Sequence, residues 1–328
     1  MMEEEEKVDE ELQKKIEELQ ELKGVGETIA RRLAEAGYDL QSIAVATSAE
    51  LVEAAEISEG KAKQIIQEAK RKAKIGELVT AEQLLERRKK VGRITTGSSA
   101  LDELLGGGVE TRATTEFFGE YGTGKSQLAH QLCVNVQLPV ERGGLEGTAL
   151  VIDTEGTFRP ERIVQMASAL GLDTSKTLQN IGVYRVYTVE DQMLAAEKAE
   201  EEIDRRGVRL LVVDSLISLF RTEYLGRELL APRQQKIARH VAYLNKLADV
   251  KDLAVVVTNQ VMAKPDIFFG DPTRPAGGHI VAHGMTTRVY LRKSKGNARV
   301  ARVVDSPMLP ERDRPFCICE EGIRDLPA

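Results

Sequence analysis

The segment from Gly119 to Ser126 has the residue types and the spacing of a phosphate-binding loop. It matches G-x-x-x-x-G-K-[ST] in full and follows a strand-like run at 113–118. In such loops the glycines let backbone N–H groups surround an oxyanion, the lysine (here Lys125) reaches the β and γ phosphates, and the hydroxyl of Ser126 ligates Mg²⁺. The segment predicts a nucleoside triphosphate site. The alternative is a glycine-rich turn that matches the pattern by accident.

Two other strand-like runs end in carboxylates that could act on a bound triphosphate. Residues 148–153 are mostly apolar and continue into Thr-Glu155-Gly, and residues 209–214 end at Asp214. Ligand sites of open parallel sheets lie at the carboxyl ends of the strands. We therefore expect Asp214 to hold the water shell of Mg²⁺ and Glu155 to be the base that orients the attacking water. The alternative for either residue is a solvated strand end.

The composition indicates two domains and a substantial core, because 42% of the 328 residues are hydrophobic and 30% are charged. No apolar run in the sequence reaches the length of a membrane span, and the first residues are acidic rather than those of a secretory signal. We therefore expect a cytoplasmic protein with no membrane partner. Three cysteines cannot pair evenly, and we interpret them as ordinary buried thiols.

The net charge of −6 is unevenly distributed along the chain. Residues 1–21 contain ten acidic residues and three lysines, whereas residues 272–304 contain no acidic residue. The basic residues of that second stretch are Arg274, Arg288, Arg292, Lys293, Lys295, Arg299 and Arg302. An acidic head and a separate basic stretch leave a nucleic-acid partner open.

The first quarter of the chain predicts a charged tail and a small helical domain. We expect residues 1–21 to be a partly disordered tail that runs into a helix, and residues 22–74 to be helical. The turn Leu22-Lys-Gly-Val-Gly before the first helix-like run has the pattern of a helix-hairpin-helix. Gly24 and Gly26 would present backbone amides to a DNA phosphate. Residues that would add positive charge there are Arg31, Arg32, Lys61 and Lys63. The alternative is a plain helical domain with glycine caps.

The remainder of the chain predicts a linker and an α/β domain. Residues 75–91 form the expected linker, in which Thr80 and Gln83 predict a capping box at a helix start. Over residues 92–328, strand-like and helix-like runs alternate. Alternation of this kind predicts a mostly parallel sheet with helices on both faces.

Several blocks of the sequence together resemble the archaeal RadA recombinases of the RecA-like superfamily. They are residues 119–127, 153–162, 220–227, 233–236, 258–262 and 277–283, and the resemblance extends from about Leu22 to Asp325. It implies a RecA-like P-loop ATPase core preceded by a small all-α helix-hairpin-helix domain. It also implies a nucleoid-associated, ATP-dependent recombinase of DNA repair that coats single-stranded DNA, searches double-stranded DNA for homology and exchanges strands.

The resemblance also implies roles for particular residues. Those expected at ATP and Mg²⁺ are Gly119, Glu120, Tyr121, Gly122, Thr123, Gly124, Lys125, Ser126, Gln127, Arg162, Asp214, Gln260 and Pro307. Lys125 and Glu155 would be catalytic, Arg162 would stack on adenine and Gln260 would sense the γ phosphate. Pro307 belongs to a stretch that would cap ATP bound by a neighbouring subunit.

Two segments are implied to bind DNA. The first carries Arg221, Arg227 and Arg233, and the second is a glycine-rich mobile loop, 271–287, with Gly277 and Gly278. Spaced arginines suit phosphate contacts along a strand. The alternative for each arginine is a surface or intersubunit salt bridge.

The linker departs from the family pattern. Members carry F-x-x-A, whose Phe enters a pocket on the next subunit, whereas this chain has Leu78-Val-Thr-Ala81. A homo-oligomer, either a helical filament or a ring, is still expected. Two other functions stay open: a regulatory ATPase that binds ATP and DNA without strand exchange, and a RecA-fold phosphotransferase.

Overall fold

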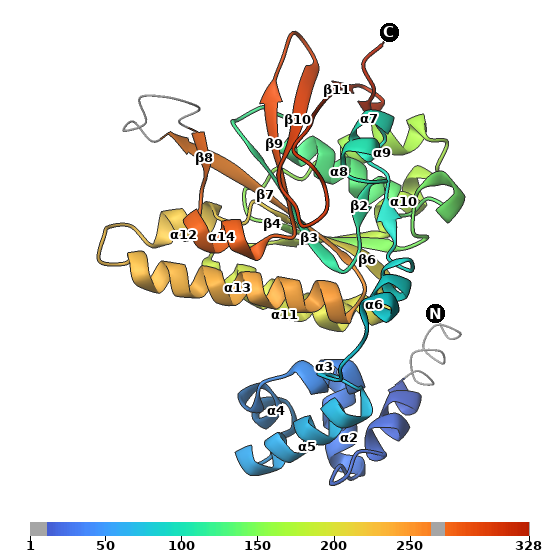
Figure 1. Cartoon of the computed structure of the whole chain (residues 1–328), viewed down its shortest axis with the longest axis vertical. Helices are drawn as coiled ribbons and strands as arrows, with labels where there is room; N and C mark the ends of the chain where they lie inside the picture. The colour runs from blue at the N-terminus through green and yellow to red at the C-terminus, as the bar shows by residue number, and fades with distance from the viewer. Residues whose placement is uncertain (1–11, 264–272, 328) are drawn as a thin grey trace. The chain divides into compact units, whose positions relative to one another are not determined.

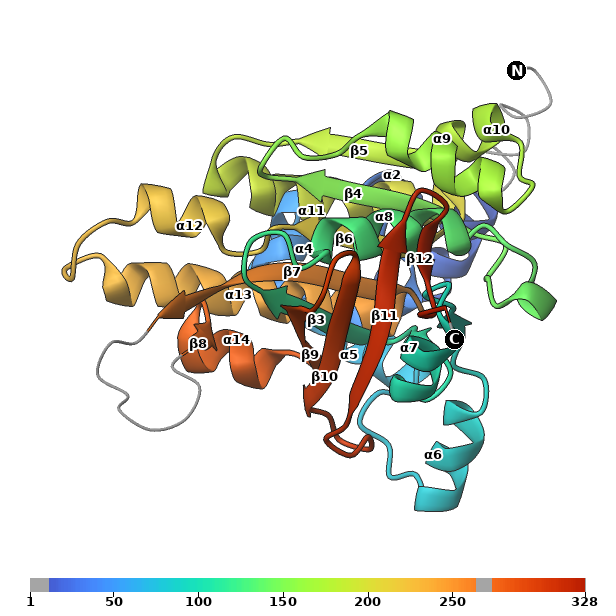
Figure 2. The ribbon, with the colours of Figure 1, turned by 90° about the horizontal axis from the view of Figure 1, so that it is seen from above.

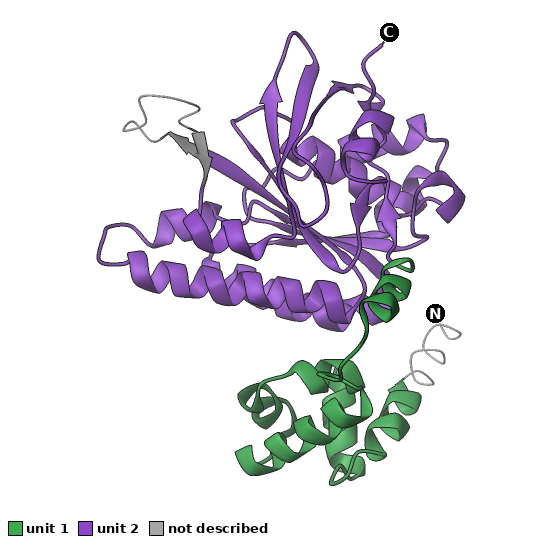
Figure 3. Ribbon diagram, viewed as in Figure 1, with its two compact units in different colours: residues 1–90 green, residues 91–328 purple. Residues whose placement is uncertain are grey.

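The computed structural model describes residues 12–263 and 273–327 (Figure 1). The chain divides into two compact units, residues 1–90 and residues 91–328 (Figure 3). Among the described residues, no helix combines the length and the apolar composition that crossing a membrane requires.

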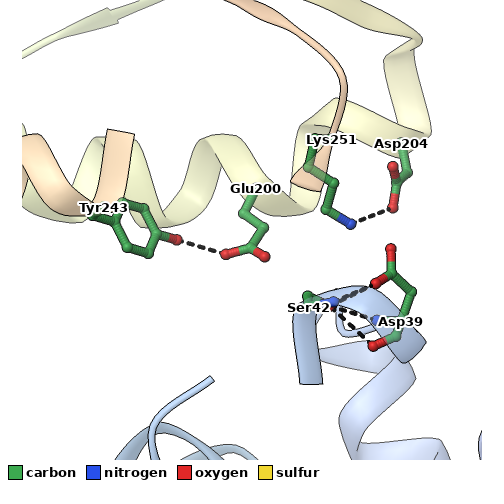
Figure 4. A network of polar contacts seen from close by, with 6 residues as sticks. All are labelled: Asp39, Ser42, Glu200, Asp204, Tyr243 and Lys251. Carbon is green, nitrogen blue, oxygen red and sulfur yellow. Dashed lines mark hydrogen bonds and ion pairs between the residues drawn. The ribbon is translucent and has the colours of Figure 1, made fainter. Parts of the chain in front are cut away.

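The first unit is entirely helical. Its helices span residues 12–20, α2 (Glu27–Glu35), α3 (Leu40–Val45), α4 (Ser48–Ala55), α5 (Glu59–Lys72) and α6 (Ala81–Arg88). Side-chain caps begin several of them, for example Asp39, whose carboxylate accepts the Ser42 N–H at 2.7 Å (Figure 4). The predicted capping box of α6 is confirmed, because Thr80 and Gln83 exchange bonds of 2.9 and 3.2 Å.

The helix at 12–20 shows that this unit extends into the segment expected to be a charged tail. Ile16 and Leu19 are 3% and 1% exposed and pack with Leu33, Leu51 and Ile65 in one core. Ile16, Leu19 and Leu22 recur at helical spacing among the acidic residues, so the high charge of this segment concealed an apolar face. Residues 1–11 of the expected tail lie outside the described residues.

The second unit is built on one large sheet. Its strands are β3 (Ala113–Gly119), β4 (Thr148–Asp153), β5 (Ile181–Arg185), β6 (Val208–Asp214), β7 (Ala254–Ala263), β8 (Thr273–Pro275), β9 (Thr287–Lys293), β10 (Ala298–Asp305), β11 (Asp313–Cys319) and β12 (Gly322–Arg324). The order is β12-β11-β10-β9-β3-β7-β6-β4-β5, with β8 on β7 and a separate pair, β1 (Arg93–Ile94) with β2 (Val109–Glu110). Strands β5, β4, β6, β7, β3 and β9 run parallel to one another. Strands β9, β10, β11 and β12 pair antiparallel, as does β8 with β7.

Helices cover both faces of this sheet. They are α7 (Ser99–Leu104), α8 (Lys125–Asn135), α9 (Pro160–Ala169), α10 (Thr174–Gln179), α11 (Val189–Arg206), α12 (Ser218–Glu223), α13 (Leu230–Val250) and α14 (Gly278–Gly284), with a 3-10 turn at Val140–Arg142. Side chains of β4 alternate between two cores: Val151 packs with Leu132 of α8, and Ile152 packs with Leu244 of α13. Figures 1 and 2 show α8 and α9 on one face and α11 and α13 on the other. The predicted α/β core is therefore confirmed.

Polar contacts join α11 to α13 at the edge of that second core. The Tyr243 hydroxyl donates to Glu200 at 2.6 Å, and Lys251, just after α13, pairs with Asp204 at 3.1 Å (Figure 4). The Lys251 side chain is only 2% exposed, so its ammonium depends on this carboxylate.

His240 is a buried titratable residue of the same helix pair. It is 1% exposed, its Nε2 lies 3.2 Å from the Gln192 amide nitrogen, and its ring lies 6.1 Å from the Phe220 ring. Burial disfavours the imidazolium and lowers the pKa of His240 to about 4. The folded state therefore holds His240 neutral over a pH range in which the unfolded chain takes up a proton.

We predict a loss of stability in mild acid that depends on His240. The contribution of neutral His240 to the free energy of unfolding is fully present above about pH 6.5. It falls by about 3 kcal/mol in total as the pH drops toward 4. Urea unfolding between pH 7.5 and 4.5 should show a steeper loss of stability for wild type than for His240→Leu, whereas replacement of the exposed His279 of α14 by Asn should keep the wild-type slope. Equal slopes for wild type and His240→Leu would refute the assignment.

Candidate nucleotide and DNA site

The predicted phosphate loop joins the end of β3 to the start of α8. Gly124 has φ of 102° at the helix N-cap, and a Cβ on Gly119 would lie 2.2 Å from the Leu291 carbonyl oxygen. Both positions therefore require glycine. The Lys125 ammonium donates to the carbonyl oxygens of Gly119 and Glu120, each at 2.9 Å. Burial lowers the pKa of Lys125, and the Asp214 and Glu155 carboxylates oppose that shift.

The other residues of the loop differ in exposure. Thr123 is buried and its hydroxyl donates to the Glu120 carbonyl at 2.8 Å, which closes the turn. Tyr121 is 87% exposed. Gly122 has φ of 75° and lies beside the Lys293 ammonium of β9. The α8 N-terminus that follows presents backbone N–H groups toward the loop, as an oxyanion site needs.

Asp214 and Ser126 are the residues that could hold Mg²⁺. Asp214 lies at the end of β6, is 6% exposed, and accepts hydrogen bonds from the hydroxyls of Thr258 and Thr157. Among the residues that the structure describes, no three His, Cys, Asp or Glu side chains form a metal cage. Mg²⁺ instead prefers one or two protein oxygens together with phosphate oxygens and water. A hydroxyl and a carboxylate therefore fit it.

Glu155 and Gln260 line the same cavity, of about 400 Å³. Glu155 is exposed in the loop after β4, and Gln260 stands near the end of β7. The other lining residues are Ser215, Ile217, Ser218, Arg221, Thr222, Leu225, Asn259 and Ala276. The sheet thus brings together two residues that lie more than a hundred positions apart in the sequence.

Asp153 organises the loop that carries Glu155, a role that the sequence did not indicate. One carboxylate oxygen accepts the N–H groups of Glu155, Gly156 and Thr157 at 3.2, 2.8 and 3.1 Å, and the other accepts that of Phe158 at 3.2 Å. Asp153 is 4% exposed, so these bonds replace its hydration. A carboxylate directly before a Thr-Glu-Gly-Thr turn is the signal that could have indicated this role.

Thr154 joins the two loops at the strand ends. Its hydroxyl donates to the Ser215 carbonyl at 3.0 Å and accepts the Ser215 N–H at 2.8 Å. The segments after β4 and β6 are therefore held together directly behind Glu155 and Asp214.

Arg162 and Gln127 contact each other, at 2.7 Å between Nε and Oε1. The Arg162 guanidinium also donates to the Cys319 and Glu320 carbonyls between β11 and β12. Stacking of Arg162 on adenine stays a prediction. Pro307 lies exposed between β10 and β11, and its role at a neighbour's ATP also stays a prediction.

The arginines of the first DNA segment flank a second cavity, of about 240 Å³. Arg221, Arg233 and Gly277 line it together with Tyr224 and Ile237, whereas Arg227 is exposed outside it. Arg221 also lines the cavity of Glu155 and Gln260. Within the described part of the chain, none of the three arginines pairs with a carboxylate, so their charges are available to a ligand.

Part of the second DNA segment is regular secondary structure. Residues 273–275 form β8 and residues 278–284 form α14, which buries Val281 completely against the α13 side of the core. Gly277 has φ of 96° and a Cβ there would lie 2.4 Å from Val281, while Gly278 has φ of 68°. Residues 271 and 272 lie outside the described residues.

The basic stretch at 272–304 is partly neutralised by carboxylates from elsewhere. Arg288 pairs with buried Glu116 at 2.7 Å, and Arg292 and Arg302 pair with Asp313 at 3.5 and 3.4 Å. The sequence of this stretch, which has no acidic residue, therefore suggested more free positive charge than the folded structure leaves there.

In the helical unit, Gly24 and Gly26 lead into α2. Gly24 has φ of 90°, and a Cβ there would lie 2.9 Å from the Lys61 ammonium. Gly26 is the N-cap of α2 and forms no side-chain cap bond. Of the other predicted cations, Arg31, Arg32 and Lys63 pair with Glu27, Glu56 and Glu59. The backbone amides and Lys61 are therefore the better candidates for a phosphate contact.

The linker presents its apolar residues to solvent. Leu78 is 100% exposed, and Ala81 is the first residue of α6, on which Leu84 and Leu85 are 50% and 57% exposed. No residue of α6 is buried.

Two family models match this chain. The Rad51 model matches residues 87–326, and a model described as a SAM-like helix-hairpin-helix tandem matches residues 16–71. The chain belongs to the Rad51 family. Its members are DNA-dependent ATPases that generally use ATP and Mg²⁺, and this membership supports a RecA-like recombinase function in general. The helix-hairpin-helix match supports DNA binding.

We predict that Asp153 acts on turnover through Glu155. Asp153→Ala leaves four backbone N–H groups without their acceptor, which should cost about 2 kcal/mol of stability. Turnover of ATP should fall by about tenfold or more, because the loop no longer fixes Glu155, while nucleotide affinity stays within a few-fold. Asp173→Ala removes the cap of α10 away from the site and should cost about 1 kcal/mol with turnover unchanged. Steady-state hydrolysis and urea unfolding test both variants; normal turnover in Asp153→Ala would contradict the prediction.

Proposed function

We propose that this protein is an ATP-dependent DNA recombinase, which forms filaments on single-stranded DNA and exchanges strands with homologous double-stranded DNA. The position of Arg221 carries the proposal. This side chain lines the cavity of Glu155 and Gln260 and also the cavity of Arg233 and Gly277. Arg221 thus borders both the cavity of the expected base and γ-phosphate sensor and the cavity of the expected DNA-binding residues.

In the proposed reaction each residue at the strand ends has a separate task. Lys125 exchanges its two carbonyl acceptors for phosphate oxygens, and Ser126 and Asp214 hold Mg²⁺, which supplies positive charge at the phosphates. Glu155 accepts a proton from the attacking water. Gln260 hydrogen-bonds at the γ phosphate and so distinguishes ATP from ADP.

The remaining contacts are proposed on the family resemblance. Arg162 stacks on adenine, and Pro307 of a neighbouring copy caps the nucleotide. Arg221, Arg227 and Arg233, with the backbone at Gly277 and Gly278, contact the phosphates of the single strand. Within the described residues none of these arginines pairs with a carboxylate, which supports this contact. Gly24 and Gly26 present backbone amides to a DNA phosphate. The same proposal includes that this protein is of the archaeal RadA type and is associated with the nucleoid.

The experiment that tests the proposed function is displacement-loop formation with ATP and homologous duplex DNA. Wild type should form the product only with ATP. DNA and ATP binding without product would instead indicate a regulatory ATPase, and transfer of the γ phosphoryl group to a protein without any DNA effect would indicate a phosphotransferase.

Variants of Glu155 and Lys125 should lose ATP hydrolysis for different reasons. Glu155→Gln should bind ATP normally and lose about 100-fold or more in turnover, as expected for loss of a general base. Lys125→Ala should lose nucleotide binding itself, because the ammonium no longer meets the phosphates. Equilibrium binding of a fluorescent ATP analogue separates the two, with exposed Glu141→Gln as the control. Near-normal hydrolysis by Glu155→Gln would remove that residue from the mechanism.

We expect the self-assembly of this chain to be weaker than that of family members whose linker carries Phe. Leu78 in a pocket shaped for Phe leaves unfilled volume, which should cost about 1 kcal/mol per interface, a factor of about five. In light scattering, Leu78→Phe should lengthen filaments and Ala81→Glu should give mostly monomers. Gln83→Glu adds the same charge to α6, keeps its capping box and should assemble as wild type. Normal polymerisation of Ala81→Glu on DNA would show that the linker is not the contact.

A further inference from the structure

A buried polar cluster reaches the cavity of Glu155 and Gln260 through Asn259 and has no role in the chemistry proposed above. It consists of Glu116 on β3, Asn259 on β7 and Arg288 on β9, which are 0%, 1% and 8% exposed. Polar side chains at this depth are costly unless they are hydrogen-bonded to one another.

Glu116 and Arg288 form the fixed part of the cluster. They are directly opposite residues on neighbouring strands, and the Arg288 Nε donates to the Glu116 carboxylate at 2.7 Å. The guanidinium also lies 5.3 Å from the Phe118 ring. A buried pair of this kind resists separation because either charge alone would be uncompensated. Glu116 stands three residues before Gly119, so this anchor is continuous with the strand that carries the phosphate loop.

Asn259 connects the anchor to both sides of the site. Its amide nitrogen donates to Glu116 at 2.8 Å and to the Ala276 carbonyl at 2.7 Å. Its amide oxygen accepts the N–H of Gln260 at 2.8 Å. The Gln260 carbonyl in turn accepts the Ala276 N–H at 2.8 Å. Ala276 directly precedes Gly277 and Gly278, the glycines of the second DNA segment.

We propose that Asn259 is the positioning residue that couples nucleotide binding at Gln260 to the backbone of Ala276, Gly277 and Gly278. This inference rests on the proposed function. Gln260 and Ala276 are held to each other and to one amide, so a displacement of Gln260 toward a phosphate moves Ala276 and the two glycines that follow it. A ligand shifts such an equilibrium only through contacts that differ between the two states. The three bonds of Asn259 and the Gln260–Ala276 bond are the contacts through which a change at Gln260 reaches Ala276.

The chain offers a matched control in Asn245. Its amide nitrogen donates to the Gly284 carbonyl at 2.7 Å, and its oxygen accepts the Thr114 hydroxyl at 2.6 Å. Asn245 therefore also ties β3 to the segment of α14, but at the other end of that helix and away from both cavities. Replacing either asparagine removes a comparable set of bonds, whereas only Asn259 adjoins Gln260.

The experiment measures the affinity for a fluorescent oligo-dT with and without a non-hydrolysable ATP analogue. Coupling between two sites is typically about 5- to 150-fold, and wild type should lie in that range. In Asn259→Ala the ratio should fall to about threefold or less, measured with the analogue at a concentration that saturates each protein. Asn245→Ala should keep the wild-type ratio.

Hydrogen exchange on the unaltered protein gives a second test that does not depend on a variant folding. Adding the analogue without DNA should slow exchange over residues 276–284, and Asn259→Ser, which keeps only a short hydroxyl, should lose that response. An absent response in wild type overturns the inference, as does full coupling in Asn259→Ala or equal loss in both asparagine variants. If wild type shows no ATP-dependent DNA affinity at all, the proposed function itself fails instead.

Discussion

The parallel register of four central strands is the constraint on which the site depends. Backbone pairing sets Gly119 of β3 opposite Gln260 of β7, and Asp153 of β4 opposite Asp214 of β6. Parallel strands that start on one side of a sheet end together on the other, so the loops after them meet at a single edge. The phosphate loop, the expected base and the expected metal ligand are therefore adjacent without any direct link in sequence.

Side-chain anchors then convert this edge into defined loops. The Asp153 carboxylate accepts hydrogen bonds from four N–H groups of the segment that carries Glu155. Two hydrogen bonds between Thr154 and Ser215 connect that segment to the one after β6. Lys125, by contrast, donates to carbonyls of its own loop. These acceptors are carbonyl oxygens, which phosphate oxygens can replace as partners of the ammonium.

Two groups of arginines in the second unit differ in whether they pair with carboxylates of the described residues. Arg288, Arg292 and Arg302 lie in an acid-free stretch, yet each meets a carboxylate on another strand of the sheet. Arg221, Arg227 and Arg233 have acidic neighbours in sequence but none pairs with a carboxylate of the described residues. Cross-strand pairing, which places residues some ten to two hundred positions apart side by side, accounts for the difference.

The sequence by itself determined the phosphate loop, the alternation that gives a parallel sheet, and the strand-end carboxylates, because each depends on residues close together in the chain. Local chemistry of the same kind predicted the Thr80–Gln83 capping box. Tertiary structure decided which distant groups meet: Asp153 beneath Glu155, Arg221 between two cavities, and Asn259 between Glu116 and Ala276. It also decided that Ile16 and Leu19 belong to a core rather than a tail. Such contacts depend on strand order and helix packing, and neither is encoded in the spacing of any single segment.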